Sequence, residues 1–417
     1  MKHIIKRGCF LTLMFMLLGC LSLYAADNDL ITRQITIQLE KAGTLPDRIG
    51  SSRKYTITNL KIIGEINGTD LRMIREMAGS NSTGNSTDGM LSVLDLSEAK
   101  IVEGGDCYYK DHYTSNDVIG SHAFSYCSGL TSLNLPAGIT EIQNDAFRNC
   151  SGLTSLNLPD GITEIGNNVF YGCSGLTSLT LPAGITSIGS SAFSGCSGLT
   201  SLNLPAGITK IGDRAFQGCS GLTSLTLPDG ITSIGDCAFI DCSGLTSLNL
   251  PAGITKIGWH AFDGCSGLTS LNLPAGITSI GIGAFYGCRR LTSLTLPAGI
   301  IWIAPDAFSH CFGLTSIYVY AEKVPYIGSN VFVGVDAKEC TLYVPMGTRD
   351  DYRLSGFGNY FENIVEFEAT GIDKTTTSTD VEEVARYSVN GQRLSAPTKG
   401  LNIVKYSDGS VKKVAVQ

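Results

Sequence analysis

The sequence has little charge and few histidines. Charged residues make up 16% of the 417 residues, with 5 histidines and 2 tryptophans. An average globular domain is about 25% charged. Because 37 acidic residues outnumber 30 basic ones, the chain lacks the Lys/Arg excess that neutralises phosphates, and we do not expect nucleic acid as a partner. So few histidines leave little for a mechanism or metal site that needs several, and we expect no metal and no cofactor.

Segments apolar enough to cross a membrane are missing everywhere except at the N-terminus. A basic start is followed by residues 8–26, which carry no charge, and this layout is typical of a secretory signal peptide. Such a run could almost span a bilayer, so an uncleaved membrane anchor is the alternative. Residues 17–20 resemble a lipobox with Cys20 as the lipidated residue, whereas residues 23–25 resemble an ordinary cleavage site. Both schemes predict export, and we assign residues 1–25 as the signal peptide. Only the lipobox scheme predicts contact with a membrane, through a lipid on Cys20.

The middle of the chain repeats every 23 residues. A Phe, then a Cys three residues later, precede Leu-x-x-Leu-x-Leu-Pro and Gly-Ile-Thr-x-Ile-Gly. The cysteines are Cys127, Cys150, Cys173, Cys196, Cys219, Cys242, Cys265, Cys288 and Cys311. A degenerate unit follows at residues 327–332, and another precedes the array at residues 91–96. This period and leucine spacing predict a leucine-rich-repeat solenoid over residues 118–345, β-rich with 23-residue turns.

Each unit predicts one turn of the solenoid. Leu133 and Leu135 are two residues apart, so they face the same side of a short strand while Ser132 and Asn134 face outward. The Ala-Phe stretch predicts one helical or 3₁₀ turn that inserts Phe124 and its equivalents into the core. No single unit can bury its apolar face, so stability comes from stacking neighbouring units.

The cysteine column allows two interpretations. Stacked Cα atoms about 5 Å apart are within disulfide range, but side chains that point in parallel, and nine in number, favour free buried thiols that act as small apolar residues. Cys107 and Cys340 lie outside the column, and the sequence leaves their state open.

The flanks predict caps and a tail. Residues 26–117 are expected to form an α+β cap with strands at 35–39 and 55–63, a helix at 70–77 capped by Thr69 or Asp70, and an insertion at 104–117. Residues 346–368 predict a closing helix and strand. A Thr/Ser-rich linker at 369–380 leads to a small β segment at 381–417, with turns at Asn390-Gly391 and Asp408-Gly409.

The unit Ile-Gly-x-x-Ala-Phe-x-Gly-Cys-Ser-Gly-Leu-Thr-Ser-Leu-x-Leu-Pro closely resembles the BspA-like class of bacterial leucine-rich repeats. Residues 340–345 and 363–366 are similar to the closing segment of such proteins in gut and oral Bacteroidetes. The tail is similar to C-terminal modules of secreted proteins of that group, some used for sorting. The resemblance implies an exported or cell-surface protein, with adhesion known for some members, and it supplies no catalytic residues.

One pair of neighbours could carry chemistry. Cys237 and His260 occupy the same position of adjacent units, with Asp236 and Asp263 nearby, so a Cys–His nucleophile pair or a metal site is conceivable. The alternative is that Cys237 and His260 have no joint role and simply occupy an exposed position that varies from unit to unit. Because nothing in the sequence forms an oxyanion pocket and the turns are shallow, we expect no enzyme.

Binding is the better-supported expectation. The outward strand column is small and uncharged from Asn134 to Thr295, and it offers no hot-spot residues. Large side chains gather late in the array: Trp259, His260, Tyr286, Arg289, Arg290 and Trp302. They are the candidate ligand-binding residues; drifted surface residues, or packing of Trp302 against the C-terminal cap, are the alternative. We expect a monomeric surface or secreted protein that binds an extracellular protein or glycan in adhesion, or alternatively a polysaccharide-capture or envelope-scaffold protein.

Overall fold

The computed structural model describes residues 30–368, 383–388, 393–394, 400–406 and 411–416. The chain divides into two compact units, Met1–Phe367 and Glu368–Gln417. The predicted signal peptide, Cys20, the linker at 369–380 and the two turns at Asn390-Gly391 and Asp408-Gly409 lie outside the described residues. Within those residues, every helix is too short or too polar to span a membrane.

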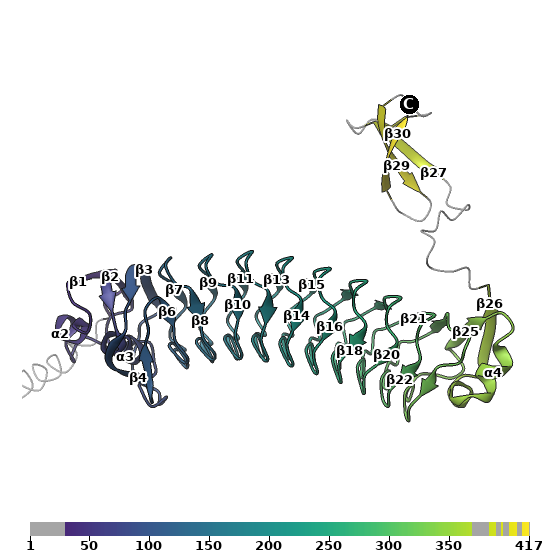
Figure 1. The fold of residues 1–417 in the computed structure, drawn as a ribbon, viewed down its shortest axis with the longest axis horizontal. Helices are drawn as coiled ribbons and strands as arrows, with labels where there is room; N and C mark the ends of the chain where they lie inside the picture. The colour runs from purple at the N-terminus through teal and green to yellow at the C-terminus, as the bar shows by residue number, and fades with distance from the viewer. Residues whose placement is uncertain (1–29, 369–382, 389–392, 395–399, 407–410, 417) are drawn as a thin grey trace, which may run out of the picture. The chain divides into compact units, whose positions relative to one another are not determined.

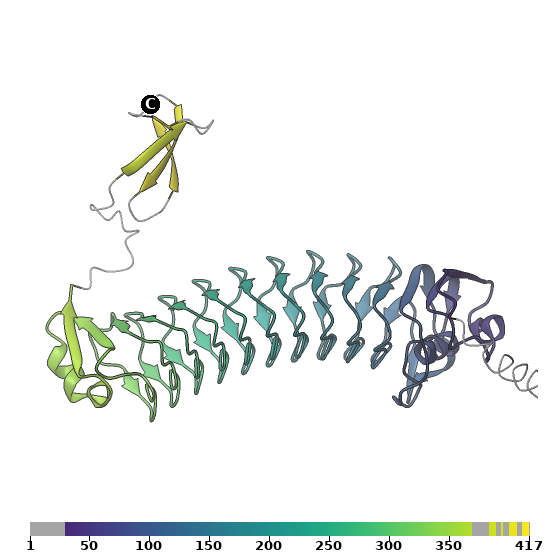
Figure 2. The ribbon, with the colours of Figure 1, turned by 180° about the vertical axis from the view of Figure 1, so that it is seen from behind.

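The first unit is a right-to-left succession of stacked turns in Figure 2, capped at both ends by small helices. Its strands before the regular repeats are β1 (Ile35–Leu39), β2 (Asn59–Ile66), β3 (Val93–Ile101), β4 (Gly104–Tyr109), β5 (His112–Thr114) and β6 (Val118–Ile119). Its helices are α2 (Leu45–Ile49), α3 (Gly68–Met77), α4 (Arg349–Leu354) and the 3₁₀ helix η1 (Gly356–Asn359).

Each turn contributes one long and one short strand. The long strands are β7 (Ser132–Asn134), β9 (Ser155–Asn157), β11 (Ser178–Thr180), β13 (Ser201–Asn203), β15 (Ser224–Thr226), β17 (Ser247–Asn249), β19 (Ser270–Asn272), β21 (Ser293–Leu296), β23 (Ser316–Val319), β25 (Thr341–Pro345) and β26 (Asn363–Phe367). The short strands are β8 (Glu141–Ile142), β10 (Glu164–Ile165), β12 (Ser187–Ile188), β14 (Lys210–Ile211), β16 (Ser233–Ile234), β18 (Lys256–Ile257), β20 (Ser279–Ile280), β22 (Trp302–Ile303) and β24 (Tyr326–Ile327).

The strands pair in parallel and in the register of the repeat. Leu133 lies opposite Leu156, and Leu248 opposite Leu271, one period of 23 residues apart. The short strands form a second parallel sheet in which Ile257 lies opposite Ile280. Period-2 alternation sends the leucine inward and its two neighbours outward, because the central leucine of each long strand is buried. The predicted solenoid of 23-residue turns is confirmed, and β3 joins it as the expected extra turn, paired with β7.

A column of stacked phenylalanines forms the interior of the solenoid. Phe124 to Phe308 are fully buried, and neighbouring rings lie 5.1 to 5.6 Å apart with interplanar angles of 1 to 14°. Phe332 extends the column at 5.8 Å. Such aromatic pairs contribute about 0.5–1.5 kcal/mol each beyond their burial. We call these ten residues the Phe column.

The cysteines of the repeat are buried free thiols, as the favoured interpretation predicted. From Cys150 to Cys311 each Sγ donates to the carbonyl oxygen of the Phe one turn earlier, at 3.0 to 3.5 Å, as Cys150 does to Phe124. Burial raises the pKa of the Cys127 thiol to about 11 and that of Cys219 to about 12. Cys107 and Cys340 are free as well. The thiols therefore fill space and satisfy carbonyl groups.

This arrangement predicts which thiols react. In native protein that begins at residue 27, a thiol reagent such as DTNB should modify only the two half-buried cysteines, Cys107 and Cys237, of the twelve free thiols described. The other ten are buried, so the reagent cannot reach them in the folded protein. Mass spectrometry after brief labelling should place the label on these two, and unfolding in guanidinium should release the rest. Rapid labelling of any column cysteine in folded protein would contradict the packing.

The Ala-Phe stretch is not the helical or 3₁₀ turn predicted. The residue two positions before each Phe, from His122 to Asn330, has a φ of 51 to 60°, and the residue before each Cys, from Tyr126 to His310, has a φ of 57 to 75°. Left-handed residues at both positions prevent a right-handed helical turn from continuing. The segment is a chain of tight turns instead, closed by bonds such as Cys127 N to Phe124 O at 3.0 Å.

The N-terminal cap covers the first turn with α3 and the β4–β5 hairpin. The strand predicted at 35–39 is β1, whereas the second lies at Asn59–Ile66 rather than 55–63. The helix is capped neither by Thr69 nor by Asp70: Asn67 is the N-cap, and the Asp70 carboxylate accepts from the Asn67 amide at 3.0 Å, which completes a capping box. Asn67 was not predicted as the N-cap because Gly68 separates it from the two predicted candidates, Thr69 and Asp70.

At the other end, α4, η1 and β26 close the solenoid, as predicted (Figure 1). Tyr352 of α4 is buried and donates its hydroxyl to the Ala321 carbonyl at 2.6 Å. The second unit is an antiparallel sheet in the order β28-β27-β29-β30, formed by β27 (Glu383–Ser388), β28 (Arg393–Leu394), β29 (Gly400–Tyr406) and β30 (Val411–Val416).

Candidate binding surfaces of the solenoid

The long-strand face is a uniform polar surface for most of its length. Its outward column of eight residues is exposed from Asn134 to Asn272, with Thr295 half-buried. Beside it runs a threonine column, in which Thr154 donates its hydroxyl to the Thr131 carbonyl at 3.0 Å and Thr315 donates to Thr292 at 3.2 Å. These hydroxyls are engaged in holding neighbouring turns together, which favours a structural role for this column.

The outward column changes character in the last turns. Where earlier turns carry Asn or Thr, Tyr318 and Tyr343 stack at 4.4 Å with an interplanar angle of 6°. Phe367 meets the edge of this pair at 5.9 Å from Tyr318 and lies 5.1 Å from Tyr320. All four aromatics are half-buried. This cluster ties β26 to the preceding turns, so packing accounts for it.

The short-strand face ends in exposed aromatics. Trp302 lies opposite Tyr326 on β22 and β24, and the rings stack at 5.5 Å. Trp302 is 37% exposed, Tyr326 72% and the adjacent Ile301 67%. Trp302 therefore contacts a neighbouring turn on one side and solvent on the other. We call Ile301, Trp302 and Tyr326 the short-strand patch.

A second group of large side chains comes shortly after Phe285 and Phe308 of the Phe column. Tyr286 lies 4.9 Å from His310, whose ring meets Phe312 edge-on at 5.4 Å. Phe312 is 52% exposed. Arg289 is exposed one turn earlier in the same column as Phe312, where seven earlier turns carry Ser. We call Tyr286, Arg289, His310 and Phe312 the turn patch.

The remaining candidate residues are more dispersed. Trp259 is 57% exposed, and the same column carries exposed Ile282 one turn later. Arg290 is exposed beside Arg289. The structure thus places Tyr286 beside His310 and pairs Trp302 with Tyr326, while Trp259 and His260 lie in earlier turns.

His260 forms its hydrogen bond with Asp263 rather than with Cys237. The His260 ring leans over Gly283 of the next turn, since a Cβ built there would lie 2.5 Å from ring atoms, and its Nδ1 lies 3.0 Å from Asp263 Oδ2. Burial raises the pKa of the Cys237 thiol, only partly offset by Arg214. An activated thiol needs a lowered pKa, so this geometry favours the interpretation as unrelated surface residues.

A third cluster, absent from the candidate residues, lies where the cap meets the first turn. Tyr109 of β4 lies 4.9 Å from the ring of His122, and His112 of β5 lies 5.2 Å from it. Beneath them Arg75 is fully buried, its guanidinium 4.7 Å from the Tyr109 ring. Desolvation lowers the pKa of His122, with further lowering by His112, Arg75 and Lys110 against the opposing effect of Asp145.

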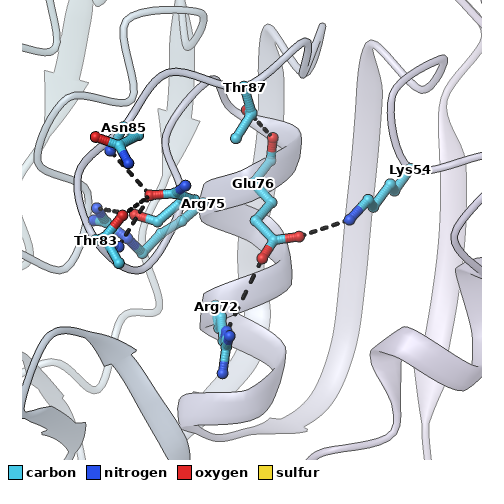
Figure 3. A network of polar contacts seen from close by, with 8 residues as sticks. Lys54, Arg72, Arg75, Glu76, Thr83, Asn85 and Thr87 are labelled. Carbon is cyan, nitrogen blue, oxygen red and sulfur yellow. Dashed lines mark hydrogen bonds and ion pairs between the residues drawn. The ribbon is translucent and has the colours of Figure 1, made fainter.

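Arg75 holds this cluster in place from α3, and Figure 3 shows it beside the contacts that Glu76 makes on the same helix. Its Nη1 donates to the carbonyls of His122 and Ala123 at 2.6 and 3.0 Å, and its Nη2 donates to Ser125 O at 3.1 Å and to Ser80 and Asn81. On the exposed side of α3, Glu76 pairs with Lys54 at 2.7 Å and with Arg72 at 4.0 Å. The cluster is therefore a structural joint between cap and solenoid.

Sequence reasoning missed Tyr326, His310 and Phe312, although a signal was present. Continuing each column into the ninth and tenth units places Tyr326 after Trp302, and Phe312 after Arg289. The exposed aromatics occur in the units where the motif degenerates, so the regular repeat no longer marks their positions.

The comparisons with known proteins agree with the fold. The BspA type leucine rich repeat region matches residues 117–246 and 232–346, together more than half of the chain. A solved leucine-rich repeat protein from Bacteroides ovatus is 27% identical, with 63% of this chain and 69% of that chain covered and a TM-score of 0.53.

Two further solved proteins resemble the chain in sequence. The Treponema pallidum leucine rich repeat protein is 28% identical over 43% of this chain and 75% of that one, with a TM-score of 0.33. A leucine rich cell surface protein from Faecalibacterium prausnitzii is 23% identical over 63% and 86%, with a TM-score of 0.28. No curated protein matches the chain. On the repeat match and the observed solenoid, the chain belongs to the BspA-type leucine-rich repeat family.

Proposed function

We propose that this protein is an exported, surface-associated binding protein without catalytic activity, and that it engages an extracellular protein in adhesion through the short-strand and turn patches. One observation supports this most. Exposed Arg289, Trp302, Phe312 and Tyr326 lie within residues 289–326, whereas the same columns in earlier turns carry Ser, Lys or Glu. Tyr, Trp and Arg dominate the energetics of protein interfaces.

Separate observations support the proposed export and the proposed absence of catalytic activity. Membership of the BspA-type family and the uncharged run at residues 8–26 favour export to the surface. The raised pKa of Cys237 supports the absence of a catalytic thiol. A hydrolytic activity that disappears on Cys237→Ala would overturn the non-enzymatic part.

The test is a binding screen with reverted patches. Protein from residue 27 onward is measured against a panel of extracellular matrix proteins and a glycan array by surface plasmon resonance. Trp302→Ser with Tyr326→Ser, and Arg289→Ser with Phe312→Ser, install residue types that earlier turns carry, so folding should persist. We expect one or both pairs to weaken binding at least about 30-fold, the effect of losing a hot spot of about 2 kcal/mol.

Controls come from the same columns. Ser279→Ala with Lys256→Ala changes β20 and β18 at the position that Trp302 occupies on β22, and it should leave binding unchanged. Binding to a matrix protein that neither patch variant weakens would contradict the proposed surface.

The alternative is capture of a repetitive polysaccharide, which the uniform exposed Asn/Thr column from Asn134 to Thr295 would suit. Retention on the glycan array without binding to any protein would favour that function over adhesion.

A further inference from the structure

The two ends of the solenoid leave complementary strand edges open. Successive long strands pair in parallel, from β1 with β2 to β25 with β26, with one break between β11 and β13. Among the residues that the structure describes, β1 has no neighbour on its other side and neither has β26. All these strands run in the same direction and follow one another in chain order. The free edge of β1 can therefore pair with the free edge of β26 in the way that successive strands already pair.

The geometry of these edges fits a continuation of the sheet. Both strands are five residues long; β1 alternates exposed and buried side chains from Thr36 to Leu39, and β26 does so from Asn363 to Val365. The caps cover the core at each end with α2 and α4 but add no strand beyond β1 or β26 (Figures 1 and 2). A second chain could therefore place its β1 beside β26 in the register that successive turns already use.

The ends also carry opposite charge. Residues 30–58 hold five basic and two acidic residues, a net charge of +3, whereas residues 335–367 hold three basic and six acidic ones, a net charge of −3. Arg48 and Arg53 lie directly beside β1, where with Ile35 and Ile37 they line a small cleft of about 170 Å³. Glu362, at the start of β26, is exposed.

Exposed apolar side chains accompany the charges. Val365 on β26 is 40% exposed, Leu354 on α4 83% and Met346 62%, while Leu30 is 46% exposed at the other end. A strand added to β26 would cover part of this surface, and burying it would favour association.

We propose that the protein associates with further copies of itself head to tail, the β26 edge of one chain pairing in parallel with the β1 edge of the next. Such a contact joins two different surfaces, so it extends into a linear array rather than closing as a symmetric dimer. An array would also present the binding patches repeatedly and raise avidity, but the contact itself does not depend on the proposed function.

Sedimentation velocity of protein from residue 27 onward tests the proposal. At about 20 mM NaCl we expect the weight-average mass to rise with protein concentration to about twofold or more above the monomer. It should fall to the monomer value at about 500 mM, because salt screens exposed charges. A protein that stays monomeric at low salt and high concentration would overturn the proposal.

Charge reversal supplies a test that a folding defect cannot imitate. Arg48→Glu with Arg53→Glu makes the first end acidic, and Glu339→Lys with Glu362→Lys makes the second end basic. Each variant alone should remain monomeric, and an equimolar mixture of the two should associate again. Lys210→Glu with Lys256→Glu, on the short strands of the middle turns, should associate like the unaltered protein. Failure of the mixture to recover association would also refute the contact.

Discussion

Replacing Phe216 with alanine is expected to lower the free energy of unfolding by about 3–5 kcal/mol, the usual cost of removing a buried aromatic ring. Phe216 is fully buried and stacks on Phe193 at 5.3 Å and on Phe239 at 5.2 Å. The alanine would leave a cavity in the middle of the Phe column and remove two ring contacts at once. Because each turn contacts only its neighbours, the loss should also separate the solenoid into halves that unfold less cooperatively.

Chemical denaturation followed by tyrosine fluorescence and circular dichroism measures this effect. The unaltered protein should unfold in one broad transition, and Phe216→Ala in an earlier and less steep one. Phe216→Leu keeps most of the volume and should cost less than the alanine. Gln217→Ala, the neighbouring half-buried residue, is the control and should change stability by less than about 0.5 kcal/mol, as surface substitutions usually do. An alanine variant as stable as the parent would contradict the stacked column.

The solenoid could be predicted because its sequence signal repeats. Phe, Cys and Leu return every 23 residues, and a position that must stack on its own copy in the next turn has to stay apolar and of similar size. The same rule let the columns be assigned and the cysteines be interpreted as buried thiols. The tight turns were harder. Their left-handed residues include His122 and Arg214, whose types give no hint of a positive φ, so the pattern was mistaken for a helical turn.

The candidate sites were predicted less well than the fold. Trp302 was identified from its residue type, but its stacking partner Tyr326 lies in a degenerate unit that the motif no longer marks. The Arg75 cluster left no sequence signal, because it depends on how the non-repeating insertion with Tyr109 and His112 folds back over the first turn. The contacts of Arg75 with the insertion and the first turn join segments 34 to 50 residues apart, beyond any local pattern.

Replacing Arg75 with methionine is expected to lower the free energy of unfolding by about 3–5 kcal/mol, because each buried acceptor left without a donor costs about 1–3 kcal/mol. The methionine preserves most of the side-chain volume but leaves the carbonyls of His122, Ala123 and Ser125 without their donor in a buried site. The cation–π contact with Tyr109 is lost as well. The damage should be local: the β4–β5 hairpin and residues 120–125 should exchange amide hydrogens faster, while the Phe column beyond Phe170 stays protected.

Two variants separate the role of Arg75 from a general effect on α3. Arg72→Met alters the same helix one turn earlier. The Arg72 side chain is 43% exposed and its ion pair with Glu76 is long, at 4.0 Å, so its loss should lower the free energy of unfolding by less than about 0.5 kcal/mol. Arg75→Lys keeps the charge but cannot reach carbonyls in several directions at once, and we expect an intermediate loss. Hydrogen exchange, read out by mass spectrometry, measures local protection in each variant. Thermal denaturation measures the stability of each variant. Equal stability of Arg75→Met and Arg72→Met would show that the cap is held to the solenoid by apolar packing alone.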